Sequence, residues 1–353
     1  MKNSAQRLAL FAVACASLVS ASWIATPAYA WDRGEVEPFA ILPAGTPMVE
    51  GLTVGPDGKV YVPTFNPTAG SGPAQLFTFS PEGKQLRVVN IANSSPAMLG
   101  LGFNPVTHQL LVIDFGAGKV LAVNPDTGAS SVFMTVSTAG AGLNALTFDA
   151  AGNVYVSDSF QGIIWTTGPG GGAGTIWKQD PLLTTVGTPP FGANGVEFNK
   201  ARSIMFVANT GNDTLVQIAV TNVGGKLTAG AATVFTNSIN GADGIVLDKD
   251  DNIWTAANQA DEIVVVDPTG KAIAKLGDFN GVSKDGITRG LLFPASPAFS
   301  KDGKWLLVTN LELDLTSIGI TQSVDSQWAA QVKRHSIAKL RARIPPVSDK
   351  DED

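Results

Sequence analysis

The tetrapeptide VEGL at residues 49–52 begins a pattern that returns five more times along the chain. The later copies are MLGL (98–101), LNAL (143–146), ANGV (193–196), ADGI (242–245) and SPAF (296–299). Each copy is followed by a short apolar segment, a turn rich in Asp, Gly, Asn or Lys, and a second apolar segment. Successive second positions are separated by 49, 45, 50, 49 and 54 residues. A strand-rich repeat of this length predicts an all-β fold, a six-bladed β-propeller.

The two ends of the chain bear on how such a ring of blades closes. The sixth repeat lacks one strand, and the apolar run at residues 39–42 is a strand without a blade. We expect this N-terminal strand to complete the sixth blade and close the ring, because closure removes open sheet edges. The basic stretch at residues 328–344 is interpreted as a final outer strand with a solvated face. A helix that binds a membrane or a partner is the alternative.

The first thirty residues are typical of a secretory signal. Lys2 and Arg7 make a basic start, an apolar run follows, and the sequence AYA at residues 28–30 fits a small-residue cleavage site. We therefore expect a signal peptide at residues 1–30 that is cleaved near Ala30. The mature protein is then exported, and is either periplasmic or secreted.

The rest of the chain is expected to form one propeller domain, residues 31–345, followed by a disordered acidic tail at residues 346–353. The only cysteine, Cys15, lies in the signal segment, so the domain has no disulfide. A formal net charge of −6 speaks against nucleic acid as a partner and is compatible with cation binding. No stretch after residue 30 is apolar for long enough to span a membrane.

The second position of the repeat predicts a cation site. In a propeller, equivalent positions on the innermost strands face one central axis. Four of these positions carry a carboxylate or an amide, namely Glu50, Asn144, Asn194 and Asp243. Ca²⁺ prefers six to eight oxygen ligands drawn from carboxylates, amide carbonyls and water. Two carboxylates and two amides therefore suit a hard divalent cation, most simply Ca²⁺, and leave room for water and a substrate.

A simpler interpretation of two of these residues is a turn, because Asn and Asp before Gly often form turns at the start of strands. It accounts separately for Asn194-Gly195 and for Asp243-Gly244. It does not account for Glu50 in the same register.

A second register lies at the ends of the second strands. Because the second strand runs antiparallel to the first, its end returns to the face where the predicted ligands lie. We expect these residues to form the wall of a substrate pocket. Strand-ending polar residues with no other role are the alternative. The register comprises Phe65, Asp114, Asp158, Asn209, Asn258 and Asn310, and the neighbouring Phe115 and Phe160 would add to an apolar wall.

These repeats resemble the gluconolactonase / senescence marker protein / luciferin-regenerating enzyme family of six-bladed propellers, to which paraoxonase and diisopropyl-fluorophosphatase are related. The resemblance spans the repeats from Glu50 to Asn310. It is carried best by ANGVEFNKARSIMFVANT at residues 193–210 and ADGIVLDKDDNIWTAA at residues 242–257.

The resemblance implies a catalytic divalent cation, usually Ca²⁺, held by Glu, Asn, Asn and Asp. By position these roles fall on Glu50, Asn144, Asn194 and Asp243. It also implies hydrolysis of a lactone or small ester, with catalysis carried by Asp243, as general base or nucleophile, and by Asn144.

The chain also departs from the family pattern. Sugar lactonases of this family have an arginine two residues before the position of Asn144, and this chain has Gly142 there. A polyhydroxylated sugar lactone would lack that charged anchor. The predicted function is an exported, calcium-dependent hydrolase of a small-molecule lactone or ester. The alternative is a non-catalytic propeller, a binding or scaffold protein with a structural cation.

Overall fold

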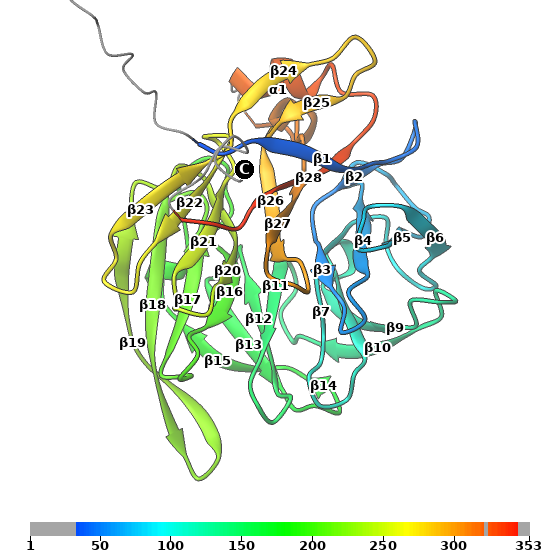
Figure 1. Cartoon of the computed structure of the whole chain (residues 1–353). Helices are drawn as coiled ribbons and strands as arrows, with labels where there is room; N and C mark the ends of the chain where they lie inside the picture. The colour runs from blue at the N-terminus through cyan, green and yellow to red at the C-terminus, as the bar shows by residue number, and fades with distance from the viewer. Residues whose placement is uncertain (1–32, 321–323, 345–353) are drawn as a thin grey trace, which may run out of the picture. The chain divides into compact units, whose positions relative to one another are not determined.

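The computed structural model describes residues 33–320 and 324–344, and most of them lie in β-strands or in the turns between strands (Figure 1). The strands form six sheets that follow one another along the chain, with a small separate hairpin. The predicted all-β, six-bladed propeller is therefore confirmed. The predicted signal peptide at residues 1–30 and the acidic tail at residues 346–353 lie outside the described residues, and both stay predictions.

The first three blades follow the order of the chain, except that β14, which lies between two strands of blade three, pairs with blade two. Blade one contains β2 (Met48–Val49), β3 (Thr53–Val54), β4 (Val60–Phe65), β5 (Gln75–Phe79) and β6 (Gln85–Asn90). Blade two contains β7 (Met98–Phe103), β8 (Leu110–Asp114), β9 (Lys119–Val123), β10 (Ser130–Thr135) and the short β14 (Gly172–Ala173), with the 3₁₀ helix η1 (Phe115–Ala117) between β8 and β9. Blade three contains β11 (Leu143–Phe148), β12 (Val154–Asp158), β13 (Ile163–Thr167) and β15 (Thr175–Gln179), and is followed by η2 (Pro181–Leu183).

The last three blades continue this order. Blade four contains β16 (Ala193–Phe198), β17 (Ile204–Asn209), β18 (Thr214–Val223) and β19 (Lys226–Asn237). Blade five contains β20 (Ala242–Leu247), β21 (Ile253–Ala257), β22 (Glu262–Val266) and β23 (Ala272–Leu276), and the hairpin of β24 (Phe279–Val282) and β25 (Thr288–Gly290) follows it. Blade six contains β26 (Pro294–Phe299), β27 (Trp305–Asn310), β28 (Ser336–Arg341) and β1 (Val36–Ile41).

Blade six is completed from the N-terminus, as predicted. β1 pairs antiparallel with β28, and Leu42, which directly follows β1, is fully buried. The basic C-terminal stretch does form a strand, β28, but the prediction that it lies outermost is wrong. β28 is the third strand of the blade because β1 pairs with its outer edge. The cationic groups of Lys339 and Arg341 lie over the Trp305 ring of β27.

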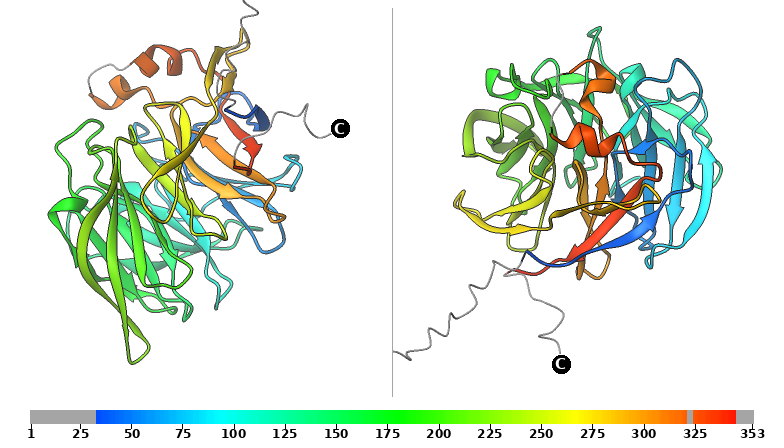
Figure 2. Two further views of the ribbon diagram at one scale, coloured as in Figure 1. Left: turned by 60° about the vertical axis from the view of Figure 1, so that its left-hand side comes forward. Right: turned by 90° about the horizontal axis from the view of Figure 1, so that it is seen from above.

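Between β27 and β28 the chain leaves the blade to form a segment that we call the cap, residues 311–320 and 324–335. It contains η3 (Leu315–Ile318) and α1 (Val324–Ala329). Seen from above, this orange-to-red segment lies across the middle of the ring of blades (Figure 2). At its two ends, Glu312 Oε2 and His335 Nδ1 lie 2.5 Å apart. Across the described residues, no helix has the length and apolar character needed to span a bilayer.

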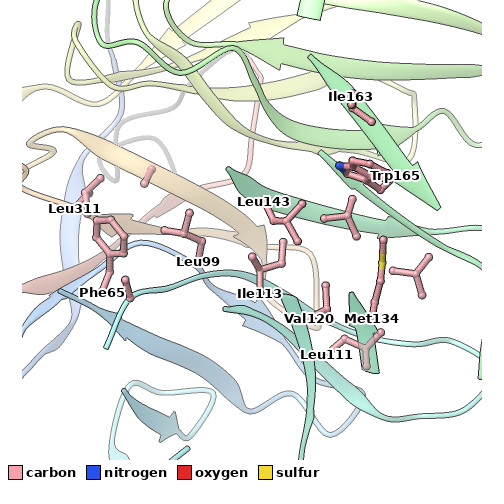
Figure 3. Packing of buried hydrophobic residues seen from close by; sticks show 14 of the residues in the cluster. Phe65, Leu99, Leu111, Ile113, Val120, Met134, Leu143, Ile163, Trp165 and Leu311 are labelled. Atoms are coloured by element: carbon pink, nitrogen blue, oxygen red, sulfur yellow. The ribbon is translucent and has the colours of Figure 1, made fainter. Parts of the chain in front are cut away.

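Buried apolar side chains of each blade pack against those of its neighbours. In the cluster of Figure 3, for example, Leu111 and Met134 of blade two pack with Leu143 and Trp165 of blade three. Among the described residues, five further clusters join the remaining neighbours, including blade six to blade one. The ring therefore has one interface of this kind between every two adjacent blades, and its stability depends on closure.

We expect Leu42→Ala to lower the free energy of unfolding by about 2 to 5 kcal/mol, because it opens a cavity where blade six meets blade one. The matched control is Leu86→Ala on β6, the outermost strand of blade one, where the leucine is 49% exposed and the cost should stay within about 0.5 kcal/mol. Denaturant unfolding measures both. Equal losses in the two variants would contradict a ring held together at this joint.

Candidate active site

The innermost strands all depart from regular pairing at the same point. The register shifts between Leu143 and Leu146 in β11, between Ala193 and Val196 in β16, and between Ala242 and Ile245 in β20. In blade one, β2 ends at Val49 and β3 begins at Thr53. Each predicted ligand lies in such an irregularity, where an inner strand can turn a side chain toward the axis instead of toward a sheet face.

This geometry brings the four predicted ligands together. Glu50, Asn144, Asn194 and Asp243 line one cavity of about 190 Å³, and none of them is more than 5% exposed. Asn194 and Asp243 are each followed by a glycine in the same strand, yet neither Gly195 nor Gly244 adopts a positive φ. The turn interpretation of these dipeptides is therefore wrong, because both lie inside β-strands.

The sixth copy of the repeat is not where the sequence pattern placed it. In β26 the register shift falls between Pro294 and Pro297, so the residue equivalent to the ligands is Ala295. The motif is therefore residues 294–297 and not 296–299, an offset of two residues. Leu99 takes the equivalent position in blade two. The four candidate ligands thus come from blades one, three, four and five, and the remaining two positions are apolar.

Hydroxyl groups hold the two asparagines in place. Asn144 Nδ2 donates to Ser159 Oγ at 3.2 Å, and Asn194 Nδ2 donates to Thr210 Oγ1 at 3.0 Å. Each hydroxyl in turn donates to a backbone carbonyl of the next blade, at 2.6 Å from Ser159 and 2.8 Å from Thr210. Because the amide nitrogens are engaged in this way, the amide oxygens are left for a ligand in the cavity.

Each of the two carboxylates has one oxygen atom without a hydrogen-bond partner in the described part of the chain. Asp243 Oδ2 accepts a hydrogen bond from Asn258 Nδ2 at 2.9 Å. Among the described residues, Asp243 Oδ1 and Glu50 Oε2 are buried without a hydrogen-bond partner. Burying an unpartnered carboxylate oxygen is costly. A hard cation would satisfy both oxygens, so the residues present fit a divalent cation.

Without a cation these carboxylates hold their protons unusually firmly. Burial raises the pKa of Asp243 to about 7, against the hydrogen bond from Asn258 that lowers it. Burial, helped by the charge of Asp243, raises the pKa of Glu50 well above its ordinary value. No group of three Asp, Glu, His or Cys side chains suited to a metal occurs in the described residues. An oxygen set completed by amides favours Ca²⁺ over the softer transition metals.

Three of the eight residues predicted for the substrate wall, Phe65, Phe115 and Asn258, line this cavity, and Phe160 is not among its lining residues. The side chains of the four remaining residues are used elsewhere. Asp114 accepts from Ser95 N at 3.1 Å, Asp158 from Gly142 N at 3.0 Å and Trp165 Nε1 at 3.1 Å, Asn209 Nδ2 donates to Leu182 O at 2.9 Å, and Asn310 Oδ1 accepts from Leu292 N at 3.0 Å. These four residues fasten the loops between strands.

The strand pairing explains this division. Leu143 pairs with Asp158 and Ala193 with Asn209, but Ala242 pairs with Ala257 and not with Asn258. The true equivalents of Asn258 are therefore Ser159 and Thr210, one residue after the positions that the sequence pattern selected. These two residues were missed. A hydroxyl directly after each strand end, in VSDS and in VANT, is the signal that could have found them.

The rest of the cavity wall comes from segments outside the repeat. The cap contributes Leu311, Leu313 and Ile318, and the loops before β16 and β26 contribute Phe191 and Phe293. The apolar wall was predicted only from its members in the repeat. Apolar walls of this kind exclude water and strengthen electrostatic interactions at the polar end of a site.

A family model described as "SMP-30/Gluconolactonase/LRE-like region" matches residues 93–277. A luciferin-regenerating enzyme has a similar structure, with a TM-score of 0.61, 13% identity, and coverage of 86% of this chain and 95% of that one. A putative gluconolactonase has a TM-score of 0.59 at 15% identity, with coverage of 87% of this chain and 92% of that one. The calcium-binding protein regucalcin from Agrobacterium tumefaciens has a TM-score of 0.58 at 19% identity, with coverage of 88% of this chain and 98% of that one. At these identities the likeness shows the fold alone. A comparison with curated proteins found no match.

We expect chelator-treated protein to bind one Ca²⁺ in a calorimetric titration, and Asp243→Asn to weaken that binding by more than about a hundredfold. Removing even a residue that supports a metal ligand costs about 10- to 100-fold. The substitution keeps the shape of the side chain and removes its charge. Asp250→Asn, on the same blade with a 64% exposed side chain, is the control and should bind normally. Equal affinity in all three proteins would place the cation elsewhere.

The raised pKa values predict an unusual pH dependence in the cation-free protein. Between about pH 4 and pH 7 the folded state keeps protons that the unfolded chain, with an aspartate pKa of about 4, has released. The melting temperature in chelator should therefore fall as the pH rises through this range. The decline should be smaller in Asp243→Asn and should vanish with saturating Ca²⁺. The same slope in wild type and variant would show that Asp243 does not cause it.

Proposed function

The chain belongs to the SMP-30/gluconolactonase/LRE-like family, and we propose that it is a hydrolase that opens a lactone or cleaves a small ester with the help of a divalent cation, most simply Ca²⁺. One observation carries the proposal. Two buried carboxylates with unpartnered oxygens and two amides converge at the polar end of an otherwise apolar cavity. A site that only needed stability would bury a paired or apolar set there.

Glu50, Asn144, Asn194 and Asp243 would hold the cation. When bound, it would polarise the carbonyl of the substrate as a Lewis acid. The residues of the chain supply the remaining functions. Asn144, fixed through Ser159, presents an amide oxygen to the cavity, and the apolar wall limits the water that can reach the polar end.

Asp243 is suited to move the proton of the attacking water. Asn258 Nδ2 donates to its Oδ2 at 2.9 Å, and its Oδ1 has no partner among the described residues and can accept a proton. As the water oxygen bonds to the carbonyl carbon, Asp243 accepts a water proton. The ester C–O bond then breaks, and the proton passes to the departing alkoxide oxygen. The product is a hydroxy acid from a lactone, or an acid and an alcohol from an ester.

We expect the Ca²⁺-loaded protein to hydrolyse members of a panel of simple lactones and aryl esters, and Asp243→Asn to lose about 10²- to 10⁴-fold in kcat, the range for a general base. Product acid is measured by pH-indicator absorbance, at Ca²⁺ concentrations that saturate each protein by its own titration. Asp250→Asn should retain wild-type turnover. Full activity in Asp243→Asn would contradict this mechanism. A protein that Ca²⁺ stabilises but that hydrolyses nothing would instead be a binding propeller with a structural cation.

A further inference from the structure

The polar and apolar groups of the cavity are sharply separated. Its polar side chains are the four candidate ligands together with Thr210 and Asn258. Every other lining residue that the structure describes is Phe, Leu, Ile or Pro, and none is Lys, Arg, His, Tyr, Ser or Gln. Hydrogen bonds also occupy the Thr210 hydroxyl and the Asn258 amide nitrogen. The site therefore offers polar contacts at one end and almost none along its wall.

This separation sets what a substrate can carry beyond its carbonyl group. A hydroxyl held against the phenylalanine and leucine wall would lose its hydrogen bonds to water without replacement, which costs free energy. A methylene in the same place would gain by leaving water, by about fourfold in binding for each one. The wall thus selects against polyhydroxylated molecules and in favour of hydrocarbon.

An aromatic row extends this wall toward the solvent. Ring centroids are 6.1 Å apart between Phe65 and Phe115, 5.8 Å between Phe115 and Phe160, and 5.6 Å between Phe160 and Phe191. Phe160 is 49% exposed, which is high for a phenylalanine. A Cβ on Gly142 would lie 2.6 Å from the Phe160 ring, so the ring occupies the space that a longer side chain at position 142 would need.

We propose that the substrate is an apolar lactone or ester whose alkyl or aryl group lies along this aromatic wall, with its carbonyl at the polar end of the cavity. The inference rests on the proposed hydrolase function and specifies its substrate class. A sugar lactone is excluded by the same wall. The row of rings from Phe65 through Phe115 links the lining of the cavity to the exposed ring of Phe160.

Lactones that share one ring test the proposal. With Ca²⁺-loaded wild-type protein, kcat/KM is measured for δ-valerolactone, δ-hexalactone, δ-octalactone and δ-decalactone, and for D-glucono-δ-lactone, which carries hydroxyls on the same ring. We expect kcat/KM to rise about threefold to fourfold per methylene over the first members and to be lowest for the gluconolactone. A gluconolactone that is hydrolysed faster than the alkyl lactones, or no dependence on chain length, would overturn the proposal.

Variants locate the effect on the wall. Phe191→Ser should reduce the ratio of kcat/KM for δ-decalactone to that for δ-valerolactone by at least about tenfold. Phe160→Ala should reduce kcat/KM for δ-decalactone, which has the longest chain, relative to that for δ-valerolactone. Val132→Ala removes a valine that is 55% exposed on β10 and should leave the ratio unchanged. Unchanged ratios in both phenylalanine variants would also overturn the proposal.

If neither this series nor the panel of simple lactones and aryl esters is hydrolysed, the proposed function fails and a binding measurement decides the class of ligand. Alkyl-substituted cyclohexanones keep a ring and a carbonyl but cannot be hydrolysed. Their affinity for the Ca²⁺-loaded protein, measured by calorimetry, should rise with the alkyl chain and fall in Phe191→Ser. Affinity that does not change with chain length would overturn the apolar site independently of catalysis.

Discussion

The close approach of the innermost strands around the axis is the constraint on which the rest of the structure depends. A Cβ on Gly195 would lie 2.5 Å from the carbonyl oxygen of Asp243, and one on Gly244 would lie 2.5 Å from that of Ala295. Only glycine permits such contact between the backbones of neighbouring blades. The third position of the repeat is therefore small, and the second position is carried to the axis at the same level in every blade.

That constraint makes the axis an unfavourable place for polar side chains, and yet four of them lie there. Each asparagine is fixed by a hydroxyl that also ties its blade to the next, so that Ser159 and Thr210 serve both the fold and the site. By contrast, Glu50 Oε2 and Asp243 Oδ1 are buried without a hydrogen-bond partner among the residues that the structure describes. Local conflicts of this kind, polar burial without partners, are where natural proteins sacrifice stability for function.

The sequence predicted the blades and the closing N-terminal strand, and it missed most of the side chains that the loops and the cap add to the cavity. The period specifies the blades, and position two specifies the ligands in blades one, three, four and five, because every inner strand bends at the same point. The pattern failed in blade six, where the bend is two residues earlier, at Ala295. It failed by one residue at Asn258, because polar residues on both sides of a strand end look alike without the pairing. Leu313, Ile318 and Phe191 were not predictable, since loops and the cap have no period.

The repeating segments and the non-repeating segments contribute different kinds of side chain to the cavity. The inner strands supply the polar end of the cavity, and their geometry cannot change without disturbing the contact between adjacent blades. The cap and the connecting loops supply most of the apolar wall, and they lie outside the strand pairing that closes the ring. Substitutions in the wall can therefore alter which molecule fits while the candidate cation site stays intact. In this fold the residues that would select the substrate are thus separate from those that would hold the cation. Phe160 is an example, because its ring takes the space that a longer side chain at position 142 would need and so keeps this part of the wall apolar.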